Sequence, residues 1–212
     1  MSEILTRPLS LWSVIVDGAW LLIPLAVIFI AVVWVFIARC VALRKARRGS
    51  ADIMHRIREC VMENDLDNAV KICKSLPTPL ARVLERGVKR IGSPIPEINA
   101  AMDNAGNIET DRLGKGLTFL SLASGGAPLI GFIGTVVGMM EAFNAMATAA
   151  VTPGVGPLAS GICQALVTTV GGLAVGLCAL AAHNILAGMI NRHTTFLNSN
   201  ILEFLDFLTE PV

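Results

Sequence analysis

Three long stretches of this 212-residue chain carry no charged side chain, and they restrict its fold more than any other feature. Residues 18–38 and 116–140 contain no Asp, Glu, Lys or Arg, and after Glu141 the chain is again uncharged over residues 142–191. A helix needs roughly 20 apolar residues, at about 1.5 Å rise each, to cross a bilayer. The third stretch is interrupted by a turn signal, Thr-Pro-Gly-Val-Gly-Pro, at residues 152–157. The sequence therefore predicts an all-α membrane protein with three transmembrane helices.

Composition agrees with this prediction but would not establish it alone. The chain is 54% hydrophobic with a mean hydropathy of +0.66, against about 45–50% apolar residues in soluble domains. It shows no nucleophile–base pair, phosphate-binding loop or metal-ligand spacing, so we expect neither an enzyme nor a bound metal or cofactor. The net charge is only +1, and we expect no nucleic-acid partner. An odd number of cysteines, five, also argues against a disulfide framework.

The charged residues predict how the chain is oriented. Of the 17 lysines and arginines, 15 lie between residues 39 and 115, together with only 10 of the 16 acidic residues. The positive-inside rule places that region in the cytoplasm, which leaves the N-terminus outside and the C-terminus inside. The basic cluster at residues 44–48 is also suited to anchoring at anionic headgroups. The first span is too long for a signal peptide, and no small-residue cleavage site follows Arg39.

These observations divide the chain into seven segments. They are an external N-terminal segment (1–18), transmembrane helix 1 (19–38), a cytoplasmic helical region (39–115), transmembrane helix 2 (116–149), an external turn (150–157), transmembrane helix 3 (158–190) and a cytoplasmic C-terminal tail (191–212). The second and third spans are longer than a bilayer requires, which predicts tilted helices or helices that continue beyond the lipid.

The cytoplasmic region is predicted to be helical. Apolar residues recur at helical spacing over residues 53–61 and again over 66–73, which indicates a small helical hairpin. Thr78-Pro79 matches an N-cap followed by proline at the first helical position. Residues 93–97, Ser-Pro-Ile-Pro-Glu, open a further helix, and since no proline follows before Pro128, the sequence allows that helix to run unbroken into the second span.

The second and third spans each carry small residues along one helical face, with a threonine, Thr135 or Thr169, in the middle. Such a stripe suits either a tight helix–helix contact or the wall of a narrow pore, and the pattern leaves both open. The candidates for close packing are Gly131, Gly134, Gly138, Gly172 and Gly176.

The two threonines are predicted to lie at a similar depth. Counted from Gly154 in the turn, Thr135 and Thr169 lie about 28 and 22 Å along their helices, within about one turn of each other. A threonine in a membrane helix often donates to a carbonyl of its own preceding turn, which is the simpler interpretation of either one. Two of them at one depth favour a polar ring in an oligomer.

Because polar side chains in a membrane span tend to face a protein interior or a conduction path, Thr135 and Thr169 are candidates for lining a pore or a proton pathway. Three more polar residues are candidates for the same role: Thr168, Gln164 and Glu141. Buried in the membrane, Glu141 would have its charged form disfavoured by desolvation. It could carry protons, line a wet vestibule or lie at the lipid–water boundary. Gln164 is neutral and cannot carry a proton as a carboxylate does, and His183 is expected to be a packing residue.

Residues 127–139 and 161–173 resemble the ExbB/TolQ/MotA family of proton-driven motor subunits, most of all its ExbB/TolQ branch. They read Ala-Pro-Leu-Ile-Gly-Phe-Ile-Gly-Thr-Val-Val-Gly-Met and Gly-Ile-Cys-Gln-Ala-Leu-Val-Thr-Thr-Val-Gly-Gly-Leu. Residues 17–24, 64–70 and 79–84 are similar to the family as well.

The resemblance implies a multi-pass protein of the bacterial inner membrane, with a periplasmic N-terminus and a cytoplasmic C-terminus. It further implies a pentameric ring whose second and third spans line a pore around two helices of an ExbD/TolR-type partner. An aspartate of that partner would carry protons, and the motor would energise a TonB-type protein for outer-membrane transport. Thr135 and Thr169 match the pore-lining threonines of the family, whereas Gln164 stands where many members have glutamate. A TolQ-like subunit of the Tol-Pal envelope-maintenance system and a passive channel or scaffold are the alternatives.

Overall fold

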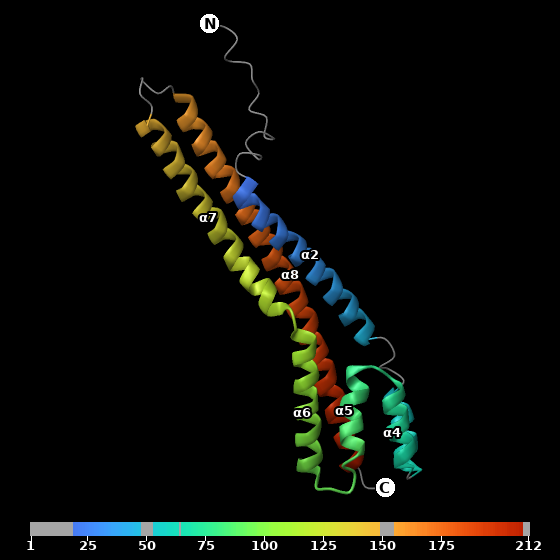
Figure 1. Ribbon diagram of the computed structural model, residues 1–212. Coiled ribbons are helices and arrows are strands. Elements are labelled where there is room, and N and C mark those ends of the chain that lie inside the picture. Colours follow the sequence, from blue (N-terminus) through green and yellow to red (C-terminus); the bar gives the residue numbers. More distant parts are fainter. Residues whose placement is uncertain (1–18, 48–52, 64, 149–154, 210–212) are drawn as a thin grey trace. The chain divides into compact units, whose positions relative to one another are not determined.

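The computed structural model describes residues 19–47, 53–63, 65–148 and 155–209, which form helices and short connections without any strand (Figure 1). The helices are α2 (Ala19–Arg47), α3 (Ile53–Met62), α4 (Leu66–Ser75), α5 (Pro79–Val88), α6 (Ile95–Gly114), α7 (Leu117–Thr148) and α8 (Val155–Thr209). The predicted N-terminal segment, 1–18, and residues 150–154 of the predicted external turn lie outside the described residues.

Three of these helices are long and apolar enough to cross a membrane, which confirms the predicted fold class. The candidate spans are Leu22–Arg44 in α2, Leu117–Ala147 in α7 and Leu158–Thr209 in α8. The most apolar window of α2 is only 11% buried. The exposed surface of α2 is apolar, and apolar surface is unfavourable in water. The exposed surface of α2 is therefore suited to contact with lipid.

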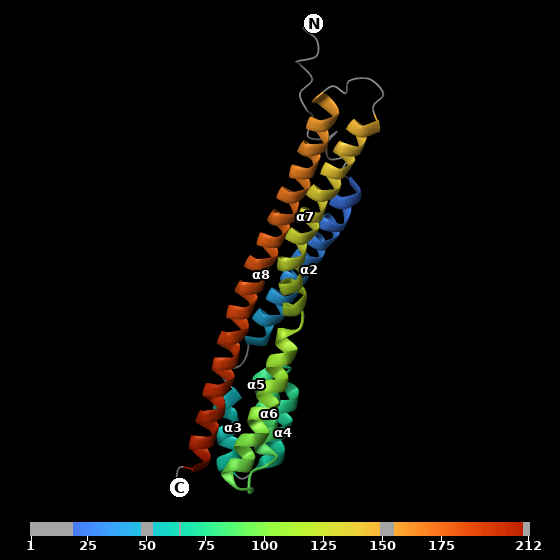
Figure 2. The ribbon, with the colours of Figure 1, turned by 90° about the vertical axis from the view of Figure 1, so that its left-hand side faces the viewer.

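The chain divides into two compact units, and the first comprises residues 1–36 and 118–184. Within its described residues, α7 and α8 lie side by side in both views (Figures 1 and 2). The start of α2 packs against them through a small buried cluster of Leu25, Ala127 and Val175. Each helix thus contributes a residue to one contact point.

The second unit comprises residues 37–117 and 185–212 and has the larger hydrophobic core. Every helix from α3 to α6 contributes to this core, together with the C-terminal part of α8. Among the most deeply buried side chains are those of Ile57, Leu84, Met102 and Phe204. Burying such side chains contributes about 1.5–3 kcal/mol each, so this unit is stabilised mainly as a soluble helical domain would be.

Local signals in the sequence account for the helix starts in this unit. The predicted hairpin is confirmed as α3 and α4, whose buried residues include Ile57 and Ala69. The predicted N-cap is also confirmed, because the Thr78 hydroxyl accepts a hydrogen bond from the backbone N–H of Ala81 at 3.3 Å, with Pro79 as the first helical residue.

One expectation was wrong: α6 does not continue unbroken into α7. The first helix ends at Gly114 and the second begins at Leu117, with Gly116 between them at φ +94°. Glycine adopts this left-handed conformation at no steric cost, whereas other residues rarely do. The break between α6 and α7 therefore lies at a glycine. The expectation of a continuous helix rested only on the absence of proline before Pro128.

A buried carboxylate links α5 to α6. The side chain of Glu109 is only 5% exposed and pairs with the guanidinium groups of Arg82 and of Arg112, the latter at 2.7 Å. Both arginines keep substantial contact with solvent, at 40% and 57% exposure. Removing one partner of a buried charge pair leaves the other uncompensated, which is more costly than the pair is stabilising.

Replacing Glu109 with alanine should lower the free energy of unfolding by about 2 kcal/mol, because two guanidinium groups lose a charged hydrogen-bond partner. Thermal unfolding of the purified full-length protein, followed by circular dichroism, measures this effect. The matched control is Asp103→Ala on the exposed side of the same helix, which should change stability by no more than about 0.5 kcal/mol. Equal effects of both substitutions would show that the buried pairing is unimportant.

Candidate functional site

Helices α7 and α8 run antiparallel and meet through small residues. On α7, Gly131 faces Gly172 of α8, while Gly138 faces Ala165 further toward the end of α7. We call this contact the small-residue seam. Its members are Gly131, Gly138, Ala142, Gly161, Ala165, Gly172 and Gly176, and all are buried except Gly161, which is half-buried.

The seam has no room for larger side chains. A Cβ atom on Gly172 would lie 2.6 Å from the Ala127 carbonyl oxygen and 2.9 Å from the Gly131 Cα. Both are backbone atoms, which cannot move without moving the helix. A Cβ atom on Gly161 would likewise lie 2.6 Å from the Cβ of Ala142. Small residues therefore bring the two backbones into direct contact, as they commonly do between membrane helices.

A proline on α7 is matched by a glycine on α8. Pro128 lies inside α7 and has no N–H, so the carbonyl of Ser124 lacks its usual helical donor. A Cβ atom on Gly176 would lie 2.6 Å from the Pro128 ring and 3.0 Å from the Ser124 carbonyl oxygen. Gly176 thus makes space for the proline ring and for the carbonyl that the proline leaves unpaired. The remaining predicted glycine, Gly134, is also buried.

A hydrogen bond from Thr169 joins the two helices across the seam. The Thr169 hydroxyl donates to the Gly131 carbonyl oxygen at 2.9 Å, and it also lies 3.4 Å from the carbonyl oxygen of Ala165 one turn before it. The neighbouring Thr168 is buried and donates to Ala165 at 2.8 Å. Thr169 therefore contributes to helix pairing, and the lone pairs on its oxygen remain able to accept a hydrogen bond.

Thr135 lies one turn along α7 from the Gly131 carbonyl that Thr169 contacts. Its side chain is half-buried, and its hydroxyl donates to the Phe132 carbonyl oxygen at 2.6 Å. Thr135 thus bonds to a carbonyl of its own preceding turn, whereas the shorter bond of Thr169 reaches a carbonyl of the other helix. Their depths differ by about one helical turn, as the residue count from the turn indicates.

The two threonines lie on the same edge of the seam. At about 100° per residue, Thr135 and Thr169 project to one side of the line where the antiparallel helices meet. On the other side, α2 approaches, with Leu22 3.6 Å from the position of a Cβ on Gly171. The threonine side, which we call the open edge, also carries the exposed apolar side chains of Phe132 and Leu166. Within the chain, the open edge faces away from α2.

Glu141 and Gln164 are not brought together with the threonines. By the same helical geometry they project from the edge of the seam opposite the open edge. This is the edge on which α2 packs, near Gly171. Glu141 is exposed, whereas Gln164 is half-buried. The five candidate pore or pathway residues therefore do not form one cluster within the chain.

Two histidines on α8 differ in their environment. His183 is half-buried, with Nδ1 3.4 Å from the Asn184 side-chain oxygen. His193, which the sequence argument did not single out, is buried and donates from Nε2 to the Leu43 carbonyl oxygen at 3.2 Å. The sequence could have indicated the burial of His193, because it lies on the same helical face as Leu186 and Leu197, which are also buried. Within the described residues, no group of His, Cys, Asp or Glu could hold a metal ion.

Comparison with known proteins gives consistent matches. The profile of the MotA/TolQ/ExbB proton channel family matches residues 75–199. An ExbB homologue of Methanothermobacter thermautotrophicus, named as a biopolymer transport protein, is 27% identical over 150 residues, covering 70% of this chain and 53% of that protein. The ExbB-like protein 3 of Synechocystis is 30% identical over 126 residues, or 58% of this chain and 59% of the relative. ExbB of Neisseria gonorrhoeae is 27% identical over 191 residues, which are 80% of each protein. The matched part thus spans little more than half of the first two relatives.

Replacing Gly172 with alanine should destabilise the α7–α8 pair, since the added Cβ would overlap the Ala127 and Gly131 backbones. Overpacking of this kind costs about 1–3 kcal/mol. The control is Gly188→Ala on the same helix, where the added Cβ meets no atom within 4 Å and alanine favours the helix. Thermal unfolding in detergent should show a lower midpoint for the first variant alone, and equal midpoints would contradict the tight contact.

Proposed function

Because the chain belongs to the MotA/TolQ/ExbB proton channel family, we propose that it is the ring-forming subunit of a motor driven by the proton-motive force. In this proposal, copies of the chain form a pentamer in a bacterial inner membrane. Their α7 and α8 helices surround two transmembrane helices of an ExbD/TolR-like partner, and proton flow through the assembly energises a TonB-like periplasmic protein. The function is transport across a membrane rather than covalent catalysis.

The open edge of the seam is the observation that carries this proposal. It presents Thr135 and Thr169 about one turn apart, beside exposed apolar side chains and away from α2. A partner helix can pack against the apolar groups, while hydroxyl oxygens that already donate to a carbonyl accept a hydrogen bond from a protonated carboxyl. An edge of this kind suits contact with a moving acidic side chain better than it suits lipid.

The shortage of titratable groups supports a partner as the proton carrier. Glu141 is the only Asp, Glu, Lys or Arg in α7, and α8 has none before Arg192, although it carries His183. Gln164 cannot titrate, and neither it nor Glu141 projects from the open edge. We therefore assign the proton-carrying role to the partner's carboxylate and the lining role to the threonines. Thr168, buried against its own helix, would support them.

The proposed orientation follows from charge. The region from 39 to 115 is cytoplasmic, as is the tail from 191 to 212, whereas residues 1–18 and 150–157 are periplasmic. The three transmembrane helices are those predicted at 19–38, 116–149 and 158–190. In this orientation Gly116 marks the cytoplasmic start of α7.

Two alternatives make different predictions. A TolQ-like subunit would use the same mechanism for the Tol-Pal envelope system, and the identity of the co-purifying periplasmic protein would distinguish it. A passive channel or scaffold would form a stable, functional ring without a single-span partner. Co-expression with the neighbouring open reading frame, followed by mass measurement of the intact complex, determines both the partner and the stoichiometry.

Thr169→Val should reduce proton flux by at least about tenfold in proteoliposomes that contain the chain and its partner, because the open edge loses a hydroxyl. Losing the bond to Gly131 costs about 1 kcal/mol of stability, too little to dissociate the complex. A pH-sensitive dye trapped in the vesicles reports the flux.

Two variants serve as controls for that measurement. Thr169→Ser retains the hydroxyl and should retain flux. Thr195→Val removes a hydroxyl that donates to the Asn191 carbonyl oxygen at 3.1 Å on an exposed part of α8, and it should have no effect. Full flux in Thr169→Val, with the complex intact, would refute the role of the open edge.

A further inference from the structure

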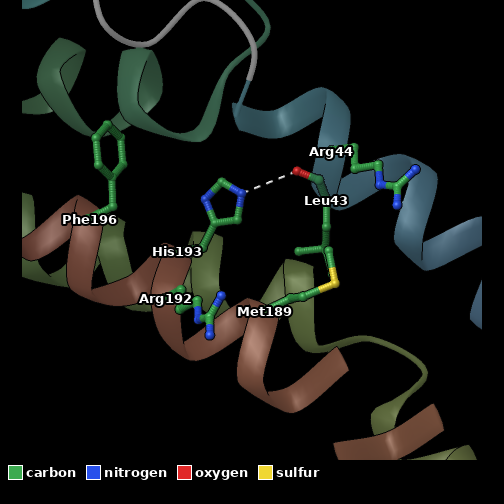
Figure 3. Close-up of a pocket in the computed structure, with 6 residues that line it drawn as sticks. All are labelled: Leu43, Arg44, Met189, Arg192, His193 and Phe196. Carbon is green, nitrogen blue, oxygen red and sulfur yellow. Dashed lines mark hydrogen bonds between the residues drawn. The ribbon is translucent and has the colours of Figure 1, made fainter. Parts of the chain in front are cut away.

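A cavity of about 520 Å³ lies between the end of α2 and α8 within the second unit (Figure 3). Its size is that of a small-molecule binding site, typically about 300–1,000 Å³. Its lining residues come from two segments far apart in the chain. They are Leu43, Arg44, Met189, Arg192, His193 and Phe196. The proposed motor function makes no use of this cavity.

The lining combines positive charge with apolar surface. Arg44 and Arg192 supply two guanidinium groups, and none of the described residues that line the cavity is acidic. Neither arginine forms an ion pair with a described residue. The basic residues that do form such pairs are Arg58, Arg82, Lys89 and Arg112. The next acidic residue along α8 after Arg192 is Glu203, about 16 Å further along the helix. The cavity is therefore suited to an anion.

His193 fixes the geometry of the cavity. Its Nε2–H donates to the Leu43 carbonyl oxygen at 3.2 Å, which Figure 3 shows as the link between α2 and α8. The carbonyl can only accept, so Nε2 carries the proton in this contact. The bond holds the backbone next to Arg44 close to the turn of α8 that carries Arg192. The backbone segments that carry the two arginines are therefore held close to each other.

The apolar surfaces beside the arginines identify the kind of anion. On α2, the residues three and seven positions before Arg44 are Val41 and Ile37, which lie on the same helical face and are 61% and 56% exposed. On α8, Met189 and Ile185 stand in the same relation to Arg192, and Ile185 is 53% exposed. Each arginine therefore ends an apolar stripe, exposed on α2 and partly exposed on α8, that leads back along its helix.

We propose that this cavity binds the phosphoryl group of an anionic membrane phospholipid, with the acyl chains lying along the two apolar stripes. Arginine guanidinium groups bind phosphate oxygens through paired, charge-assisted hydrogen bonds. A soluble phosphate would use the arginines but gain nothing from the stripes. The same position also fits the headgroup depth, because the candidate span of α2 ends at Arg44. This inference does not depend on proton coupling.

The test uses the full-length protein in nanodiscs that contain phosphatidylglycerol and phosphatidylcholine. Lipids retained after extraction into mild detergent are counted by native mass spectrometry. Wild-type protein should retain phosphatidylglycerol preferentially, and Arg44→Gln combined with Arg192→Gln should lower that retention about tenfold. Arg39→Gln is the matched control, since Arg39 lies on α2 near the same end of the span but does not line the cavity.

Three results would overturn the proposal. Unchanged retention in the double variant would exclude the cavity as the site, and equal loss in Arg39→Gln would indicate general attraction to a basic surface. Release of the lipid by millimolar inorganic phosphate would assign the cavity to a soluble anion.

A second measurement applies even if the double variant does not fold. A photo-crosslinking amino acid in place of Met189 should form an adduct with lipid, and an adduct with a protein would overturn the proposal.

Discussion

The direct contact between the α7 and α8 backbones is the interaction on which the membrane-spanning unit depends. Lipid tails are as apolar as leucine, so helices in a bilayer gain little by burying large apolar side chains against each other. They associate instead through close packing and hydrogen bonds, and both need small residues. Gly131 and Gly172 provide the packing, and Thr169 adds a hydrogen bond to the carbonyl of Gly131. The large side chains, such as Phe132 and Leu166, are consequently left on the outside.

This contact also determines which polar groups are available to a partner. Because glycine and alanine occupy the seam, the threonines are displaced to its open edge, while Glu141 and Gln164 project from the other edge. The carboxylate that the sequence makes most prominent is therefore absent from the surface that we assign to the partner. The hydroxyls on that surface already donate to backbone carbonyls. Their oxygen atoms can still accept a hydrogen bond, which suits contact with a protonated carboxyl group of another chain.

The second unit is held together by different physics. Its core is a set of large apolar side chains around Met102 and Phe204, buried as in a soluble domain, and a deeply buried carboxylate in it, that of Glu109, is paired with two arginines. The arginines at the cavity, Arg44 and Arg192, have no such partner among the described residues. Basic residues in one unit thus serve two purposes. Some neutralise a buried acid, and others remain open to an anion at the headgroup level.

The sequence by itself determined the helical class, the three spans, the α3–α4 hairpin and the cap at Thr78, because uncharged length, apolar period and capping chemistry are local properties. It also marked the glycines and threonines as special without deciding between packing and pore. Only the tertiary structure decided that the glycines meet each other, that Thr169 bonds to Gly131, and that His193 joins Leu43. These facts depend on the register between segments distant in the chain. A periodic pattern gives the face of a helix but not the residue that will lie opposite it.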